Sequence, residues 1–136
     1  MARMLDSNVL LDIITADVEW LDWSTKQFRT AATEGSVLIN PIIYAELAPA
    51  FEQQAALDRW LRPTIFTRLP LPYEAGYLAG KAFVAYRNRG GRKTSPLPDF
   101  YIGAHADCAG LTLVTRDASR YRTYFPELKF VSPKGN

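Results

Sequence analysis

The chain has 136 residues and a net charge of +2, with 48% hydrophobic and 22% charged residues, so it is long enough to form one folded domain and is not typical of a disordered protein. The chain has a single cysteine, which excludes an internal disulfide, and a single histidine, which argues against a Cys/His zinc site because such a site needs three or four of these ligands. No apolar run approaches the roughly 20 residues of a membrane-spanning helix, and Asp6 interrupts any signal-peptide core, so we expect a cytoplasmic protein with no membrane partner.

The first half of the chain predicts two short strands, each followed by helices. In chain order, these elements are a strand at 3–5, helices at 9–14 and 19–34, a strand at 36–39, and helices at 41–51 and 53–61. Gly35 ends the longer helix before the second strand. Asn40 and Pro41 start the next helix, because asparagine caps helices and proline favours the first helical position.

The second half continues the alternation of strands and helices. Its elements are a strand at 65–69, helices at 72–86 and 99–109, a strand at 111–115, a helix at 118–124 and a strand at 129–131. The pattern predicts a single α/β domain over residues 1–136: a three-layer α/β/α sandwich with a mainly parallel central sheet. Such sheets place ligand sites beyond the carboxyl ends of their strands.

Three aspartates stand where strands end or helices begin. Asp6 follows the first strand, Asp117 follows the fourth strand, and Asp99 opens the helix after a long basic loop. One interpretation is helix capping, which aspartate does well. The other is ligand binding, since the carboxyl ends of parallel strands meet at one edge of the sheet. The two interpretations are compatible, and both stay open for each aspartate taken alone.

Glu46 lies inside the helix that begins at Pro41, so it cannot cap that helix. Its neighbours at helical spacing are Ile42, Ile43 and Ala50, which form an apolar stripe. A carboxylate on that stripe points toward the core or toward a cleft in it. A dry, unpaired charge there is costly, so the side chain needs a proton, a metal ion or an arginine partner, and the buried ion pair is the open alternative to a metal.

Together, the four acids predict a metal site. Several carboxylates within about 5 Å of one another repel, and a divalent cation relieves that repulsion. Oxygen ligands alone favour Mg²⁺ or Mn²⁺ over zinc. Such a cluster leaves positions for phosphate oxygens and an attacking water, which suits the hydrolysis of phosphodiester bonds.

Four short motifs then resemble those of the PIN-domain family, and they occur in the family's order across nearly the whole chain. They are MLDSNVLLD at 4–12, NPIIYAEL at 40–47, PDFYIGAHA at 98–106 and LVTRD at 113–117. The small size resembles the VapC-type toxin of a VapBC toxin–antitoxin pair. The resemblance implies a Mg²⁺- or Mn²⁺-dependent endoribonuclease that forms a homodimer and is neutralised by a small cognate antitoxin.

The resemblance also assigns roles to residues of this sequence. The acidic catalytic and metal-binding residues that it implies are Asp6, Glu46, Asp99 and Asp117. Asn8 and Thr115 match polar residues that support this cluster by orienting carboxylates or water. Asp12 and Asp107 are possible accessory acids. His105 lies among alanines, so we expect it to be packed rather than to act as an acid.

Basic side chains gather near the third and fourth motifs. Between residues 75 and 98 there are five cations and no acid, which suits a polyanionic partner. The residues that we expect to contact RNA are Arg89, Arg92, Lys93 and Arg116. For the loop at 87–95, a solvated connection is the open alternative. Exposed aromatic residues near the helices at 41–61 would suit an antitoxin.

Two other classes of function remain open at this stage. A non-catalytic PIN-like module that binds RNA or protein would be expected to lack the acids, yet all four are present. A metal-dependent phosphatase or DNA nuclease would use the same site, and only its substrate would differ.

Overall fold

A five-stranded parallel sheet lies at the centre of the computed structural model, which describes residues 2–133. The strands are β1 Arg3–Leu5, β2 Val37–Ile39, β3 Phe66–Arg68, β4 Thr112–Val114 and β5 Phe130–Val131. Their order is β3-β2-β1-β4-β5, and every neighbouring pair is parallel. The first strand of the chain is therefore the central one, with a neighbour on each side.

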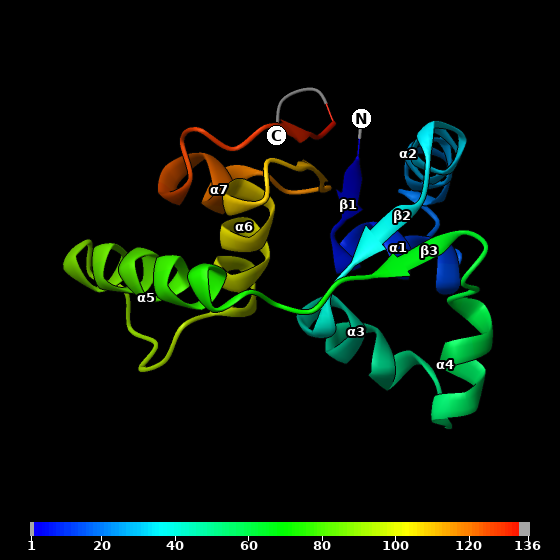
Figure 1. Cartoon of the computed structure of the whole chain (residues 1–136), viewed down its shortest axis with the longest axis horizontal. Helices are drawn as coiled ribbons and strands as arrows, with labels where there is room; N and C mark the ends of the chain where they lie inside the picture. Colours follow the sequence, from blue (N-terminus) through cyan, green and yellow to red (C-terminus); the bar gives the residue numbers. More distant parts are fainter. Residues whose placement is uncertain (1, 134–136) are drawn as a thin grey trace.

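Helices cover both faces of the sheet. They are α1 Ser7–Ile14, α2 Leu21–Glu34, α3 Pro41–Leu47, the 3₁₀ turn η1 Ala48–Ala50, α4 Gln54–Trp60, α5 Tyr73–Asn88, α6 Pro98–Cys108 and α7 Ser119–Tyr124. Figure 1 shows α2 on one side of β1 and the packed pair α5 and α6 on the other. Strands β2 and β4 are buried at every residue, as expected for a parallel sheet covered on both faces. The predicted α/β sandwich is confirmed, and the sheet is wholly parallel.

The start of α3 is as the sequence predicts, but its end is not. The Asn40 side chain accepts a hydrogen bond from the Ile43 N–H at 2.9 Å, and Pro41 occupies the first turn. The sequence predicts one helix to residue 51, but the α-helix ends at Leu47 and continues as a 3₁₀ turn. The physical reason is Pro49, which has no N–H to donate to the turn before it.

The register of the central strands places the candidate residues at one edge of the sheet. Leu5 of β1 pairs with Val114 of β4, and the Asp6 N–H donates to the Val114 carbonyl at 2.8 Å. Asp6 and Thr115, which directly follow β1 and β4, therefore lie side by side at the ends of neighbouring strands. Within residues 2–133, no helix combines the length and apolarity needed to span a membrane.

Candidate active site

Asp6 lies at the end of the central strand and is 3% exposed. Three donors converge on its carboxylate: Oδ1 accepts the Ser7 backbone N–H at 2.8 Å, and Oδ2 accepts the hydroxyls of Thr115 at 2.9 Å and Tyr121 at 2.8 Å. Burial nevertheless raises the pKa of Asp6 to about 6. Asp6 thus caps α1, as one of the two interpretations of the sequence expects. Ligand binding by the same carboxylate stays a prediction.

Glu46 reaches the same place from α3. The Ser7 hydroxyl donates to Glu46 Oε1 at 2.8 Å and lies 3.5 Å from Asp6 Oδ1, so it links the two acids. Burial raises the pKa of Glu46, and the nearby charge of Asp99 raises it further. Among the described residues Glu46 has no salt-bridge partner, so the arginine pair considered from sequence does not form.

Asp99 comes from the first turn of α6 and is only partly buried, with a side chain 39% exposed. Its Oδ2 lies 3.4 Å from Arg120 Nη1, and its Oδ1 lies 3.5 Å from the Tyr121 hydroxyl. Burial raises the pKa of Asp99, although the Arg120 charge and the Tyr121 hydroxyl oppose that rise. The Asp99 charge in turn raises the pKa of Asp6, because the two carboxylates repel each other.

Asp117 is the exposed member of the group. Its Oδ1 accepts the Ser119 N–H at 3.1 Å and the Ser119 hydroxyl at 2.9 Å, and these bonds lower its pKa. They are turn contacts of the kind that aspartate makes at the start of a helix.

One cavity of about 320 Å³ brings the four acids together. Its lining consists of Asp6, Ser7, Asn8, Glu46, Asp99, Asp117, Ser119 and Arg120. One guanidinium, that of Arg120, faces four carboxylates there. In the part of the chain from 2 to 133, no three His, Cys, Asp or Glu side chains already stand at the spacing of a metal-bound set. The cavity is thus acidic. Its carboxylates line the same hollow but are not arranged as a set of metal ligands.

The family is decided by a comparison of the whole sequence. The family model described as "PIN domain" matches residues 3–126. The chain belongs to the PIN domain family. No curated protein shows a significant sequence match to it.

Solved structures share the fold of this PIN domain at low sequence identity. VapBC2 from Rickettsia felis, bound to a DNA fragment from its promoter, is 20% identical with a TM-score of 0.73, and the match covers 97% of this chain and 98% of that one. VapBC-1 from nontypeable Haemophilus influenzae is 18% identical with a TM-score of 0.71 and the same coverage. FitAcB from Neisseria gonorrhoeae is 18% identical with a TM-score of 0.69, over 98% of this chain and 99% of that one.

Asn8 and Thr115 form a polar chain behind Asp6 in this PIN domain. The Asn8 amide donates to Thr115 Oγ1 at 3.3 Å, and Thr115 donates to Asp6 at 2.9 Å. The backbone N–H of Arg116 donates to Asn8 Oδ1 at 3.1 Å, which fixes the amide. Such outer hydrogen bonds orient the carboxylates that face a ligand.

The basic residues divide into two groups. Arg89, Arg92 and Lys93 are exposed on the loop after α5, where the Arg87 guanidinium donates to the Lys93 carbonyl at 2.6 Å. A Cβ at Gly91 would overlap the Tyr86 ring, so this loop packs closely onto α5. Arg116, in contrast, is engaged inside the protein, and its position weakens the prediction that it contacts RNA.

Arg116 belongs to a second buried acid group. Its Nε lies 3.1 Å from Asp12 Oδ2 in an ion pair that is not aligned as a hydrogen bond. Asp12 also accepts the Ser24 hydroxyl at 2.7 Å, and the guanidinium stacks over Trp20 at 5.4 Å. Asp12 does not line the four-acid cavity, so its place argues for a structural role over an accessory catalytic one.

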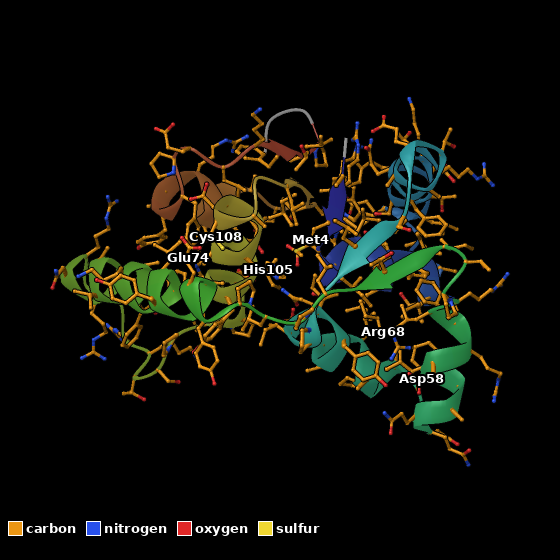
Figure 2. The ribbon with its side chains drawn as sticks, viewed as in Figure 1. Met4, Asp58, Arg68, Glu74, His105 and Cys108 are labelled. Atoms are coloured by element: carbon orange, nitrogen blue, oxygen red, sulfur yellow. The ribbon has the colours of Figure 1, made fainter. Side chains whose placement is uncertain are left out.

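The remaining polar residues of α6 also lie away from the cavity. Figure 2 shows His105 between α6 and the strand that carries Met4, with Cys108 on the α5 side near Glu74. His105 is buried and its Nδ1 lies 3.0 Å from the Asn40 amide, which donates to it. Burial lowers the pKa of His105, so the ring is neutral and packed. Asp107 lines a different hollow beside Glu127.

Four residues of the site lie outside the set that the sequence predicts. Ser7, Ser119 and Arg120 line the cavity, and Tyr121, which is not part of the lining, donates a hydrogen bond to Asp6. Ser7 lies inside the first motif, and Ser119 follows Asp117 by two residues. Their closeness to the predicted acids could therefore have indicated both. Arg120 is one of three arginines within five residues of Asp117, together with Arg116 and Arg122, and its position in the sequence does not distinguish it from them. Nothing local distinguishes Tyr121 from the other aromatic residues of the chain.

Proposed function

We propose that this PIN domain is a VapC-type toxin, a Mg²⁺- or Mn²⁺-dependent endoribonuclease that hydrolyses RNA phosphodiester bonds. The observation that carries the proposal is the four-acid cavity in which, among residues 2–133, only Asp99 forms a salt bridge. A site so acidic and so little neutralised suits an external cation. The similarity of the fold to the VapBC structures supports the toxin assignment.

The donor set fits a hard divalent cation. Burial raises the pKa of Asp6, Glu46 and Asp99, and a bound cation would oppose that effect by favouring the ionised carboxylates. The residues that we propose to hold Mg²⁺ or Mn²⁺ are Asp6, Glu46, Asp99 and Asp117. When bound, the ion would polarise the scissile phosphate and lower the pKa of the attacking water. Because the acids do not yet stand at metal-bound spacing, binding would draw them closer.

The other residues of the site would orient the acids and the substrate. Ser7 and Thr115 hold the carboxylates of Glu46 and Asp6 by hydrogen bonds. Arg120 lies against Asp99 in the cavity wall, where a phosphate group could replace the carboxylate as its partner. Arg89, Arg92 and Lys93 would contact the RNA backbone beyond the cavity.

The test is RNA cleavage by the purified protein with Mg²⁺ or Mn²⁺. Asp99→Asn should lower the cleavage rate by about 1,000-fold, since it removes a charge from the proposed ion site. Asp107→Asn is the matched control, because Asp107 is an aspartate on the same helix that lines another hollow. EDTA should abolish cleavage by the wild type.

Two outcomes would redirect the proposal. If Asp99→Asn cleaved RNA as fast as the control and metal never bound, the domain would be a non-catalytic binding module. If single-stranded DNA of the same sequence were cut faster than RNA, the site would belong to a DNA nuclease.

A small cognate antitoxin is the proposed protein partner. Two adjacent hollows on α3 and α4 share Tyr44 and Gln54, and the second also contains Phe51 and Leu57. The Tyr44 hydroxyl donates to Asp58 at 2.8 Å. Asp58 in turn forms an ion pair with Arg68, and the two residues lie together in Figure 2. Co-expression with a short neighbouring reading frame should give a stable complex that no longer cleaves RNA; a Tyr44→Ala variant should bind it less tightly.

We also propose a homodimer. Tyr73 and Tyr77 are 99% and 66% exposed on α5, and tyrosine is enriched at protein interfaces. Light scattering should give twice the chain mass of 15.3 kDa, and Tyr77→Glu should shift the population toward the monomer. A wild-type mass of one chain would contradict the dimer.

A further inference from the structure

Tyr121 is the one aromatic hydroxyl that reaches two of the four acids within the described chain. It comes from α7, is 1% exposed, and donates to Asp6 Oδ2 at 2.8 Å. Its oxygen also lies 3.5 Å from Asp99 Oδ1. The hydroxyl carries one hydrogen, so Asp6 is its main acceptor and Asp99 the alternative.

The packing of the ring alone does not explain the hydroxyl. The ring lies against Gly103 of α6, where an added Cβ would stand 2.9 Å from Tyr121 Cδ1 and 2.6 Å from Phe125 Cε2. A phenylalanine would fill this space equally well. What the tyrosine adds is a buried donor between a carboxylate at the end of β1 and one at the start of α6.

We propose that Tyr121 is a positioning residue for the divalent cation: its hydroxyl holds the Asp6 carboxylate in place beside Asp99, and Gly103 leaves the room that lets it do so. This inference rests on the proposed function, since it assumes that Asp6 and Asp99 bind the ion. Without the hydroxyl, Asp6 Oδ2 keeps only Thr115 as a side-chain donor, and its orientation is set by one bond in place of two.

The test is direct Mn²⁺ binding, measured from the electron paramagnetic resonance signal of free Mn²⁺. Tyr121→Phe should raise the Kd for Mn²⁺ by about tenfold, the lower end of what loss of such an outer hydrogen bond costs. RNA cleavage should fall at low Mn²⁺ and recover at saturating Mn²⁺. Tyr124→Phe is the matched control, because Tyr124 is a tyrosine on the same helix whose ring meets Phe100 edge to face. The Kd of this variant for Mn²⁺ should not change.

Gly103→Ala provides a second route, because it keeps the hydroxyl but pushes the ring away from α6. It should also raise the Kd for Mn²⁺. A purely structural role predicts a lower Tm for Tyr121→Phe with an unchanged Kd, and that result would overturn the inference. If the wild type itself bound no Mn²⁺, the proposed function would fail first; if the wild type bound and both variants bound equally well, only the role of Tyr121 would fail.

Discussion

Asp6 and Asp12 lie six positions apart at the two ends of α1, and both are nearly fully buried, at 3% and 2% exposure. Their surroundings differ. Asp12 has a cation, Arg116, at 3.1 Å and a hydroxyl from Ser24. Asp6 is held by three neutral donors, and the charge that shifts its pKa is that of another carboxylate, Asp99.

We interpret the difference as that between a structural acid and a proposed metal ligand. The Asp12 group is electrically complete within the protein, as buried ion pairs must be to be tolerated. The Asp6 carboxylate has hydrogen-bond donors on both of its oxygens, but no cation within the described residues forms an ion pair with it. A carboxylate that is buried without a compensating charge favours the binding of an external cation, because the cation stabilises its ionised form.

The largest expected effect is on the Asp12 group. Asp12→Asn should lower the free energy of unfolding by up to about 3 kcal/mol, because it leaves the Arg116 charge without its partner. Cleavage of RNA per folded molecule should stay at the wild-type level. Urea unfolding and an activity assay at low temperature measure the two effects. A stable but inactive Asp12→Asn protein would break the comparison.

The second effect is a pH-dependent stabilisation by Mn²⁺. The pKa of Asp6 is about 6 in the folded protein against 3.8 for the free side chain, so between these values the folded state binds more protons than the unfolded state. The metal-free protein should therefore lose up to about 3 kcal/mol of stability as the pH rises from about 4 to above 6. Mn²⁺ needs the ionised carboxylate, so its stabilising effect should grow over the same window.

Thermal unfolding with and without Mn²⁺ measures this effect. At about 100 times the Kd, the ion should add roughly 2.7 kcal/mol near pH 7.5 and much less near pH 5. An equal shift of Tm at both pH values would mean that the ion binds elsewhere.

The third effect concerns the charge of Asp99. Asp99→Asn should raise the free energy of unfolding of the metal-free protein near pH 8 by about 1 kcal/mol, the Coulomb energy of two charges a few ångströms apart in a solvated site. The variant should also lower the pKa of Asp6 and Glu46, since the Asp99 charge raises both. Carbon-13 NMR of the carboxyl groups would show this; unchanged pKa values would mean that the acids do not interact.

The smallest effect distinguishes the two groups of cations. Arg92→Ala and Lys93→Ala should each lower the slope of log affinity against log salt for single-stranded RNA by about 0.7, the value for one lost phosphate contact. Arg116→Ala should leave that slope unchanged and lower the Tm, because its partner is Asp12. Filter binding across a salt series, using the Asp99→Asn background to prevent cleavage, separates these results.

Much of the fold follows from local sequence. The strands Arg3–Leu5 and Thr112–Val114 each end in two buried apolar residues. Gly35 marks the end of one helix, and Asn40 and Pro41 mark the start of the next, through their own backbone preferences. Because parallel strands end at one edge, the placement of Asp6 near Asp117 could be predicted from order alone. The roles of those residues stay predictions.

The contacts that could not be predicted join distant parts of the chain through packing. Tyr121 reaches Asp6 across 115 positions only because α7 lies against Gly103 of α6. The sequence predicts that Arg116 contacts RNA, whereas the structure shows its side chain in an ion pair with Asp12. Neither pairing leaves a periodic or motif signal, since each depends on how two helices meet in space.

The most direct test of the account is an anomalous scattering map from crystals soaked in Mn²⁺. The uncompensated charge of the Asp6 group predicts a peak in the four-acid cavity, at coordination distance (about 2 Å) from carboxylate oxygens of Asp6 and Asp99, and none at Asp12. A map at saturating Mn²⁺ with no peak in that cavity would contradict the account.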